Sequence, residues 1–130
     1  MKRNLILCLV CLTGINTFAQ ITVGNTSLQE REVIGNLNIP WEIKWGYDGF
    51  IWMTERPGIV SRVNVETGEK NVILDIQNTV YSGNNEAGLL GMEFHPEFAT
   101  NHILFITYTY TLGNQIKERL SSFTYNTSSK

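Results

Sequence analysis

The side chains best suited to chemistry gather within residues 86–102, where carboxylates and imidazoles alternate with apolar residues: Glu86, Glu93, His95, Glu97 and His102. Such groups can transfer protons or bind a metal ion. Their spacing matches no recognised zinc pattern, and the proline that follows His95 fixes the backbone in a turn. We therefore expect His95 to be a structural turn residue, and we assign no catalytic residue and no metal ligand here.

Two further sets of side chains have both a chemical and a structural interpretation. Glu55 and Arg56 are adjacent, so on an extended strand they point to opposite sides. Ion pairs with other residues are favoured over catalysis for both. Trp41, Trp45 and Trp52 could stack against a sugar, but on strands tryptophans more often fill a core, and here we expect them between packed sheets.

Residues 40–74 provide the scaffold that must position these groups. They form short apolar runs separated by turn residues such as Asp48-Gly49 and Pro57-Gly58. Asp-Gly between apolar runs favours a hairpin because both residues tolerate positive φ, and no run keeps a helical period. The pattern predicts a four-stranded antiparallel meander with strands at Trp41–Trp45, Phe50–Thr54, Ile59–Val65 and Lys70–Leu74.

The meander pattern recurs further along the chain. The segment from Ile43 aligns with the segment from Met92, which places Trp45 and Phe94, 49 residues apart, at matching positions. A repeated four-stranded unit with a period of about 50 residues is typical of a β-propeller blade. The alternative is two unrelated meanders in a sandwich. The second repeat predicts three strands, at Gly88–Phe94, His102–Tyr110 and Glu118–Tyr125.

These patterns predict an all-β chain. Residues 20–36 are interpreted as a flexible N-terminal segment with a leading strand, formed as apolar residues appear towards Ile39. Residues 37–130 are interpreted as a partial β-propeller, with blade one at 40–75 and an incomplete blade two at 88–126.

Propeller geometry separates the loops into two faces. Loops that enter an innermost strand, and loops that join second and third strands, share the face where sites usually form. We therefore expect functional groups in Arg56–Gly58, Gln77–Ala87 and Thr111–Lys117. The opposite face would carry Tyr47–Gly49 and His95–Asn101.

The first 19 residues have the features of a secretory signal peptide: Lys2 and Arg3, a short apolar run, and the small residues of Thr17-Phe18-Ala19 before the cleavage site. Both cysteines lie in this segment. Its removal lowers the ten basic residues to eight against twelve acidic ones, so the formal charge falls from −2 to −4. The absence of a basic patch argues against nucleic acid or an anionic membrane as partner. We expect a secreted or periplasmic protein with no membrane association after cleavage.

Two motifs, LNIPWEIKWGYDGFIWMTERPGIVSRVNVETG and EAGLLGMEFHPEF, resemble the N-terminal region of the soluble PQQ-dependent glucose/sorbosone (aldose sugar) dehydrogenase family. The resemblance covers Leu37–Tyr125 and implies a six-bladed β-propeller of which this chain covers about the first two blades. It also implies oxidation of an aldose at the anomeric carbon to its lactone, with pyrroloquinoline quinone (PQQ) and calcium as cofactors. The family's catalytic histidine, PQQ ligands and calcium ligands have no counterpart in this chain, so residues 20–130 alone are expected to be inactive.

The resemblance also implies a substrate-binding residue. Glu86 lies two residues before Gly88, where the family typically has a glutamine that contacts sugar hydroxyls. A carboxylate at this position can only accept hydrogen bonds while ionised. A solvated loop carboxylate is the structural alternative. At the level of function, the alternatives to a sugar dehydrogenase are a non-catalytic secreted binding propeller and a lactonase-type propeller hydrolase.

The signal peptide gives the first testable prediction. When the gene is expressed in a host that processes secretory signals, the mature protein should begin at Gln20 and lie outside the cytoplasmic membrane. N-terminal sequencing of the exported protein checks this, and an intact Met1 on exported material would contradict it.

Overall fold

The computed structural model describes residues 20–84 and 86–126. The predicted signal peptide at residues 1–19 lies outside the described residues. The regular secondary structure of the described residues consists of strands and one short helix. It divides into two compact units, one up to Glu32 and one from Val33 onward.

The first unit is a hairpin in its described part. Strands β1 (Gln20–Val23) and β2 (Thr26–Gln29) pair antiparallel around a turn in which Gly24 has a φ of +60°. Residues 30–39 contain no strand, so the leading strand expected towards Ile39 is not formed. Asn36 and Ile39 both have positive φ, which takes the backbone out of the extended region. The Asn38 N–H instead donates to Glu55 Oε2 at 2.7 Å.

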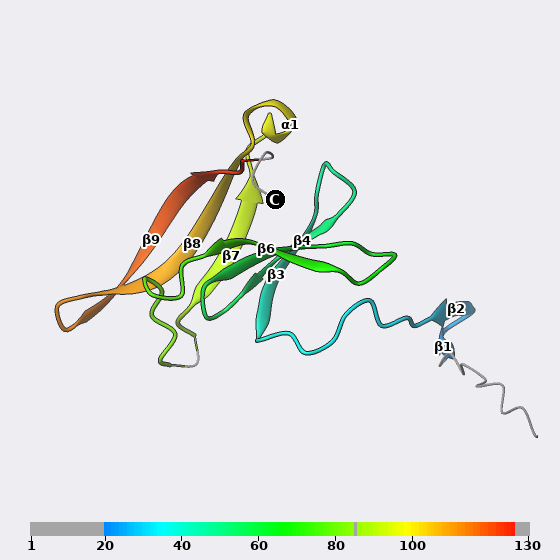
Figure 1. Ribbon diagram of the computed structural model, residues 1–130. Coiled ribbons are helices and arrows are strands. Elements are labelled where there is room, and N and C mark those ends of the chain that lie inside the picture. The colour runs from blue at the N-terminus through cyan, green and yellow to red at the C-terminus, as the bar shows by residue number, and fades with distance from the viewer. Residues whose placement is uncertain (1–19, 85, 127–130) are drawn as a thin grey trace, which may run out of the picture. The chain divides into compact units, whose positions relative to one another are not determined.

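The second unit begins with the predicted meander, which is confirmed and is called blade one. Its four strands are hydrogen-bonded in sequence order, each antiparallel to the next (Figure 1). Observed and predicted strand ends differ by at most two residues. The strands are β3 (Pro40–Trp45), β4 (Ile51–Glu55), β5 (Ile59–Val63) and β6 (Lys70–Asp75).

Blade two has three strands in the order β7-β8-β9, as the second repeat predicts. They are β7 (Leu89–Phe94), β8 (Ile103–Leu112) and β9 (Gln115–Thr124). Between β7 and β8 the expected turn contains a single helical turn, α1 (Phe98–Asn101). His95 organises it, since its Nδ1 accepts the Glu97 N–H at 3.0 Å and lies 2.8 Å from the Asn101 side-chain nitrogen.

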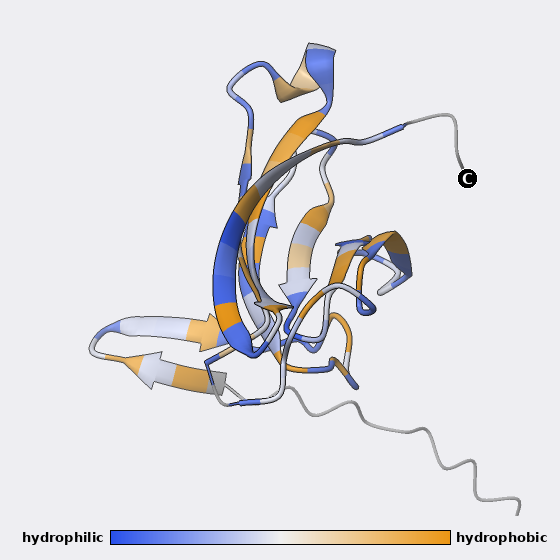
Figure 2. Cartoon of the chain, turned by 90° about the vertical axis from the view of Figure 1, so that its left-hand side faces the viewer, coloured by the Kyte–Doolittle hydropathy of each residue, from blue (hydrophilic) through white to orange (hydrophobic). Residues whose placement is uncertain are grey.

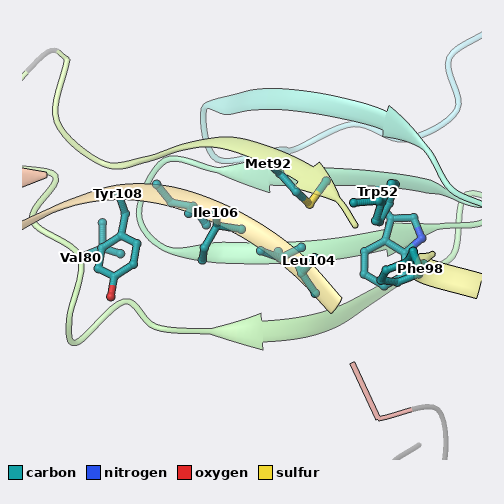
Figure 3. Packing of buried hydrophobic residues seen from close by; sticks show 10 residues of the cluster. Trp52, Val80, Met92, Phe98, Leu104, Ile106 and Tyr108 are labelled. Atoms are coloured by element: carbon teal, nitrogen blue, oxygen red, sulfur yellow. The ribbon is translucent and has the colours of Figure 1, made fainter. Parts of the chain in front are cut away.

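The hydrophobic core lies between the two blades. Trp52 of β4 is fully buried, and its ring meets Phe98 edge-on at a centroid distance of 5.6 Å (Figure 3). It also meets the Phe94 ring edge-on, at 5.3 Å. Trp52 thus confirms the expectation of a core tryptophan. Trp41 and Trp45 do not, because on β3 they are 49% and 65% exposed. The outer strand β9 is largely hydrophilic, and residues 115–120 along it are exposed (Figure 2).

The innermost strands of both blades have a bulge at the same place. On β3, Trp41 and Glu42 together face one residue of β4, Thr54. On β7, Leu90 and Gly91 together face one residue of β8, Thr107. The free amide of each bulge then donates to the threonine opposite: Glu42 N–H to Thr54 Oγ1 at 3.0 Å, and Gly91 N–H to Thr107 Oγ1 at 3.1 Å. The sequence repeat is therefore also a repeat of backbone geometry.

Thr54 also joins the two blades. Its side chain is fully buried, and its hydroxyl donates to the Leu90 carbonyl in the bulge of β7 at 2.8 Å. One hydroxyl therefore pairs with a backbone amide of blade one and a backbone carbonyl of blade two. Both of these groups lie at irregular points of the sheets, where the strand ladder is interrupted.

A partly exposed ion pair links the innermost strands β3 and β7. Lys44 Nζ of β3 lies 2.8 Å from Glu93 Oε2 of β7. The hydrogen bond between them lowers the pKa of Glu93 and raises the pKa of Lys44. The stabilisation from Glu93 is therefore present above the usual glutamate pKa and is lost as the pH falls through its lowered value. Because the pair faces solvent, its contribution is small.

The double role of Thr54 gives a stability prediction. In the complete protein, Thr54→Val keeps the side-chain shape but leaves the Glu42 N–H and the Leu90 carbonyl without this partner. We expect the free energy of unfolding to fall by about 1–3 kcal/mol. Denaturant unfolding measures it, with Thr22→Val on the exposed hairpin strand β1 as the matched control. A Thr54→Val variant as stable as the parent would contradict the role of this hydroxyl.

Candidate functional site

The loops expected on the functional face do meet at one end of the blades. Ile76 N–H donates to the Gly58 carbonyl at 2.9 Å, and Leu89 N–H donates to the Arg56 carbonyl at 2.8 Å. The segment after β4 is therefore hydrogen-bonded to both ends of the long connection between β6 and β7. At the other end of the blades, Tyr47 stacks on Phe98 at 6.1 Å, so the two first turns share the opposite face. The predicted separation of the faces is confirmed for these four segments.

The third predicted loop, Thr111–Lys117, is shorter than expected. Strand β8 continues to Leu112 and β9 starts at Gln115, and these two residues pair with each other. Only Gly113 and Asn114 form the turn, with a φ of +59° at Gly113. A two-residue turn lets the strands pair along their full length, which removes most of this segment from the set of loop residues.

Thr109 is the residue that fixes the connection between the blades. It lies on β8 and is 5% exposed. Its Oγ1 donates to the Tyr81 carbonyl at 2.6 Å and accepts the Gly88 N–H at 2.7 Å. Its backbone adds two more bonds, from Tyr81 N–H to the Thr109 carbonyl at 2.8 Å and from Thr109 N–H to the Gly88 carbonyl at 3.0 Å. Residues 81 and 88 are thereby held by a single side chain and its own backbone.

Within this loop, an asparagine and a glycine set the path of the chain. The Ala87 N–H donates to Asn84 Oδ1 at 2.9 Å, a local bond typical of asparagine in turns. Gly88 has a φ of +153°, and a Cβ there would lie 2.2 Å from Arg56 Cγ and 2.6 Å from the Arg56 carbonyl oxygen. The close approach of Arg56, the residue after β4, therefore requires glycine directly before β7.

Glu86 lies on this loop, between the Asn84 turn and Gly88. Its side chain is exposed, whereas the next residue, Ala87, is buried at 3% exposure. The carboxylate is thus presented to solvent from a backbone that is fixed on its C-terminal side. An exposed carboxylate can accept hydrogen bonds from hydroxyl groups of a ligand.

The other side chains that could take part in catalysis or binding lie apart from Glu86. His95 and His102 lie with α1 at the opposite end of the blades. A cavity of about 310 Å³ at that end is lined by Tyr47, Asp48, Arg62, Phe98, Ala99, His102 and Tyr125. Its charged groups pair with each other, since Arg62 Nε lies 2.8 Å from Asp48 Oδ2.

The expected structural role of Glu55 agrees with its contacts. The side chain is 3% exposed, pairs with Lys70 and accepts the Asn38 N–H. Among residues 20–84 and 86–126, no group of three or more His, Cys, Asp or Glu side chains is arranged to hold a metal ion. The described residues therefore do not offer a site that fits calcium.

Sequence reasoning missed two residues of the site, Thr109 and Asn84. Thr109 alternates with other β-branched and aromatic residues along β8, which is the ordinary composition of a strand. Nothing in that pattern separates its hydroxyl from the one on Thr107. Asn84 belongs to a Ser-Gly-Asn-Asn loop, where the composition indicates a turn but not which side chain closes it.

Known proteins of one family are similar to this chain over most of its length. The sequence profile of a family described as Glucose / Sorbosone dehydrogenase matches residues 37–130. Quinoprotein glucose dehydrogenase B of Acinetobacter calcoaceticus is 32% identical over 109 residues, which is 78% of this chain and 23% of that protein. The chain thus spans about a quarter of the length of this relative.

Solved structures agree on the fold. The PQQ-bound aldose sugar dehydrogenase of Streptomyces coelicolor aligns with a TM-score of 0.66 and 26% identity, over 75% of this chain and 28% of that one. A putative glucose dehydrogenase-type oxidoreductase of Thermus thermophilus aligns with a TM-score of 0.63 and 25% identity, over 74% and 28%. These neighbours confirm a β-propeller, of which this chain covers about the first two blades. By profile, sequence and fold, the chain belongs to the glucose/sorbosone dehydrogenase family.

Proposed function

We propose that this chain is the N-terminal part of a secreted or periplasmic PQQ-dependent sugar dehydrogenase that oxidises an aldose at the anomeric carbon to its lactone. The observation that carries the proposal is the family match over residues 37–130, together with relatives named as a quinoprotein and as a PQQ-bound enzyme. PQQ, when bound, would accept the two electrons and two protons that the sugar loses on becoming a lactone.

The contribution of this chain to that reaction is substrate binding. The loop at residues 81–88 lies on the face where family members are expected to bind ligands, and it carries an exposed carboxylate, Glu86. We propose that Glu86 accepts hydrogen bonds from sugar hydroxyls. The catalytic base, the PQQ ligands and the calcium ligands are proposed to come from other blades, since this chain spans about a quarter of its relative's length.

The partner we propose is therefore a small-molecule sugar. With a formal charge of −2 for the whole sequence and −4 without the leader, nothing favours a polyanionic partner. In the part of the chain that the structure describes, no helix is long and apolar enough to cross a membrane.

The activity is tested by comparing the complete protein with residues 20–130 alone. With PQQ and calcium added, the complete protein should reduce a redox dye in the presence of glucose or another aldose, and the shorter chain should not, because it lacks the remaining blades. Omission of PQQ is the control. A complete protein that binds sugar without reducing the dye would favour a binding propeller, and one that opens lactones instead would favour a hydrolase.

The role of Glu86 gives a more specific prediction. Hydrogen bonds to a charged group contribute about 1.5–3 kcal/mol, so Glu86→Gln in the complete protein should change KM for the sugar by about tenfold or more. PQQ affinity should stay unchanged, because the proposed PQQ ligands lie on other blades. Steady-state kinetics and PQQ titration measure the two quantities.

The matched control is Glu97→Gln, which changes another exposed glutamate at the opposite end of the blades. It should leave both quantities unchanged. Unchanged sugar kinetics in Glu86→Gln would show that Glu86 is a solvated loop residue. A loss of PQQ affinity in the same variant would show that the loop belongs to the cofactor site instead.

A further inference from the structure

We propose that Thr109 is a positioning residue for substrate binding: its hydroxyl ties Tyr81 to Gly88 and thereby holds Glu86 where a sugar can meet it. This inference rests on the proposed function of Glu86. Thr109 itself is buried on β8 and need not touch the sugar.

The geometry of the hydroxyl carries the argument. A threonine hydroxyl has one donor and two acceptor sites. In Thr109 the donor is used on the Tyr81 carbonyl at 2.6 Å, and an acceptor site is used on the Gly88 N–H at 2.7 Å. The two partners are seven positions apart, so one side chain closes a loop within which Glu86 lies two residues from the second anchor. The bonds are in a buried region, where losing a partner is costly.

The residues on both sides of the loop at 81–88 are also fixed. Val80 belongs to the hydrophobic cluster between the blades and lies near Tyr108, the neighbour of Thr109 on β8 (Figure 3). On the other side, Leu89 is fully buried and its N–H is bonded to the Arg56 carbonyl. With both flanks fixed, the contacts at Tyr81 and Gly88 hold the two ends of the loop.

Comparison of the two blades distinguishes the Thr109 hydroxyl bonds from the backbone bonds that both blades share. In blade one, the Arg56 N–H donates to the Ile39 carbonyl at 3.0 Å. In blade two, the Thr109 N–H donates to the Gly88 carbonyl at 3.0 Å. Ile39 and Gly88 each directly precede the innermost strand of their blade, and they lie 49 positions apart in the sequence. The backbone bond is therefore common to both blades, but the residue that makes it is arginine in one and threonine in the other. The hydroxyl bonds are a feature of blade two, the blade whose entry loop carries Glu86.

The tests use the complete protein with three substitutions on β8. Thr109→Val removes the hydroxyl at nearly constant shape, and Thr109→Ser keeps it. Thr107→Val removes the neighbouring hydroxyl on the same strand, which bonds Gly91 rather than the loop. If Thr109→Val does not fold, Thr109→Ala removes the same hydroxyl without placing a second methyl group against Gly88.

Hydrogen exchange followed by mass spectrometry reports on the loop without relying on activity. In Thr109→Val, peptides containing the Tyr81 and Gly88 amides should exchange about tenfold faster than in the parent, because a local opening becomes cheaper. Thr109→Ser and Thr107→Val should leave those peptides unchanged. Equal protection in Thr109→Val and the parent would overturn the inference.

Kinetics then link the loop to the sugar. Thr109→Val should raise KM for the sugar about tenfold with little change in kcat, and Thr109→Ser should restore it. If Thr109 acts through Glu86, the Thr109→Val, Glu86→Gln double variant should be no worse than the weaker-binding single variant. Additive effects would overturn the inference, since they would mean that the two residues act independently.

The single variants distinguish the two proposals. If Glu86→Gln raises KM and Thr109→Val does not, the positioning role is wrong and the sugar contact stands. If Thr109→Val raises KM and Glu86→Gln does not, the loop acts through another residue and the inference as stated is wrong. If neither changes KM, both proposals are wrong.

Discussion

Two hydrogen bonds made by the Thr54 hydroxyl hold the bulged strands of the two blades together. Each blade has an innermost strand with a bulge, and a bulge exposes backbone groups that the ladder cannot pair. Thr54 pairs with one such group in each blade, so two interruptions stabilise each other inside the core. The aromatic packing of Trp52 against Phe94 and Phe98 then fills the space beside this contact.

This framework leaves the two ends of the blades free to differ. At one end, aromatic rings and the Arg62–Asp48 ion pair lie together around α1. At the other end, the long connection between the blades follows a path set by Asn84, Gly88 and Thr109. Its exposed carboxylate is not used in that path. Arg62 and Asp48 pair with each other, whereas the Glu86 carboxylate faces solvent. The end that carries Glu86 is therefore the better candidate for binding a ligand.

The sequence was sufficient to predict the strands and the repeat, because alternation, Asp-Gly turns and the 49-residue period are local signals. It also separated the faces correctly, since strand order determines which turns share an end. It failed where the outcome depended on contacts distant in sequence. The expected strand before β3 is absent because Asn36 and Ile39 take positive φ, and Trp41 and Trp45 of β3 are exposed rather than packed in the core. Thr109 was not identified because its role comes from Tyr81, 28 positions away.

The contact between Thr54 and Leu90 also bears on the order in which the chain is made. The two residues are 36 positions apart, and Leu90 is the later one to leave the ribosome. Until it does, blade one has all four of its strands but neither the acceptor for its buried hydroxyl nor the rings that cover Trp52. A completed sheet must therefore wait with one apolar face open while a further stretch of chain is synthesised. That interval is when a nascent propeller of this kind is most exposed to chaperones and to misassembly with its neighbours.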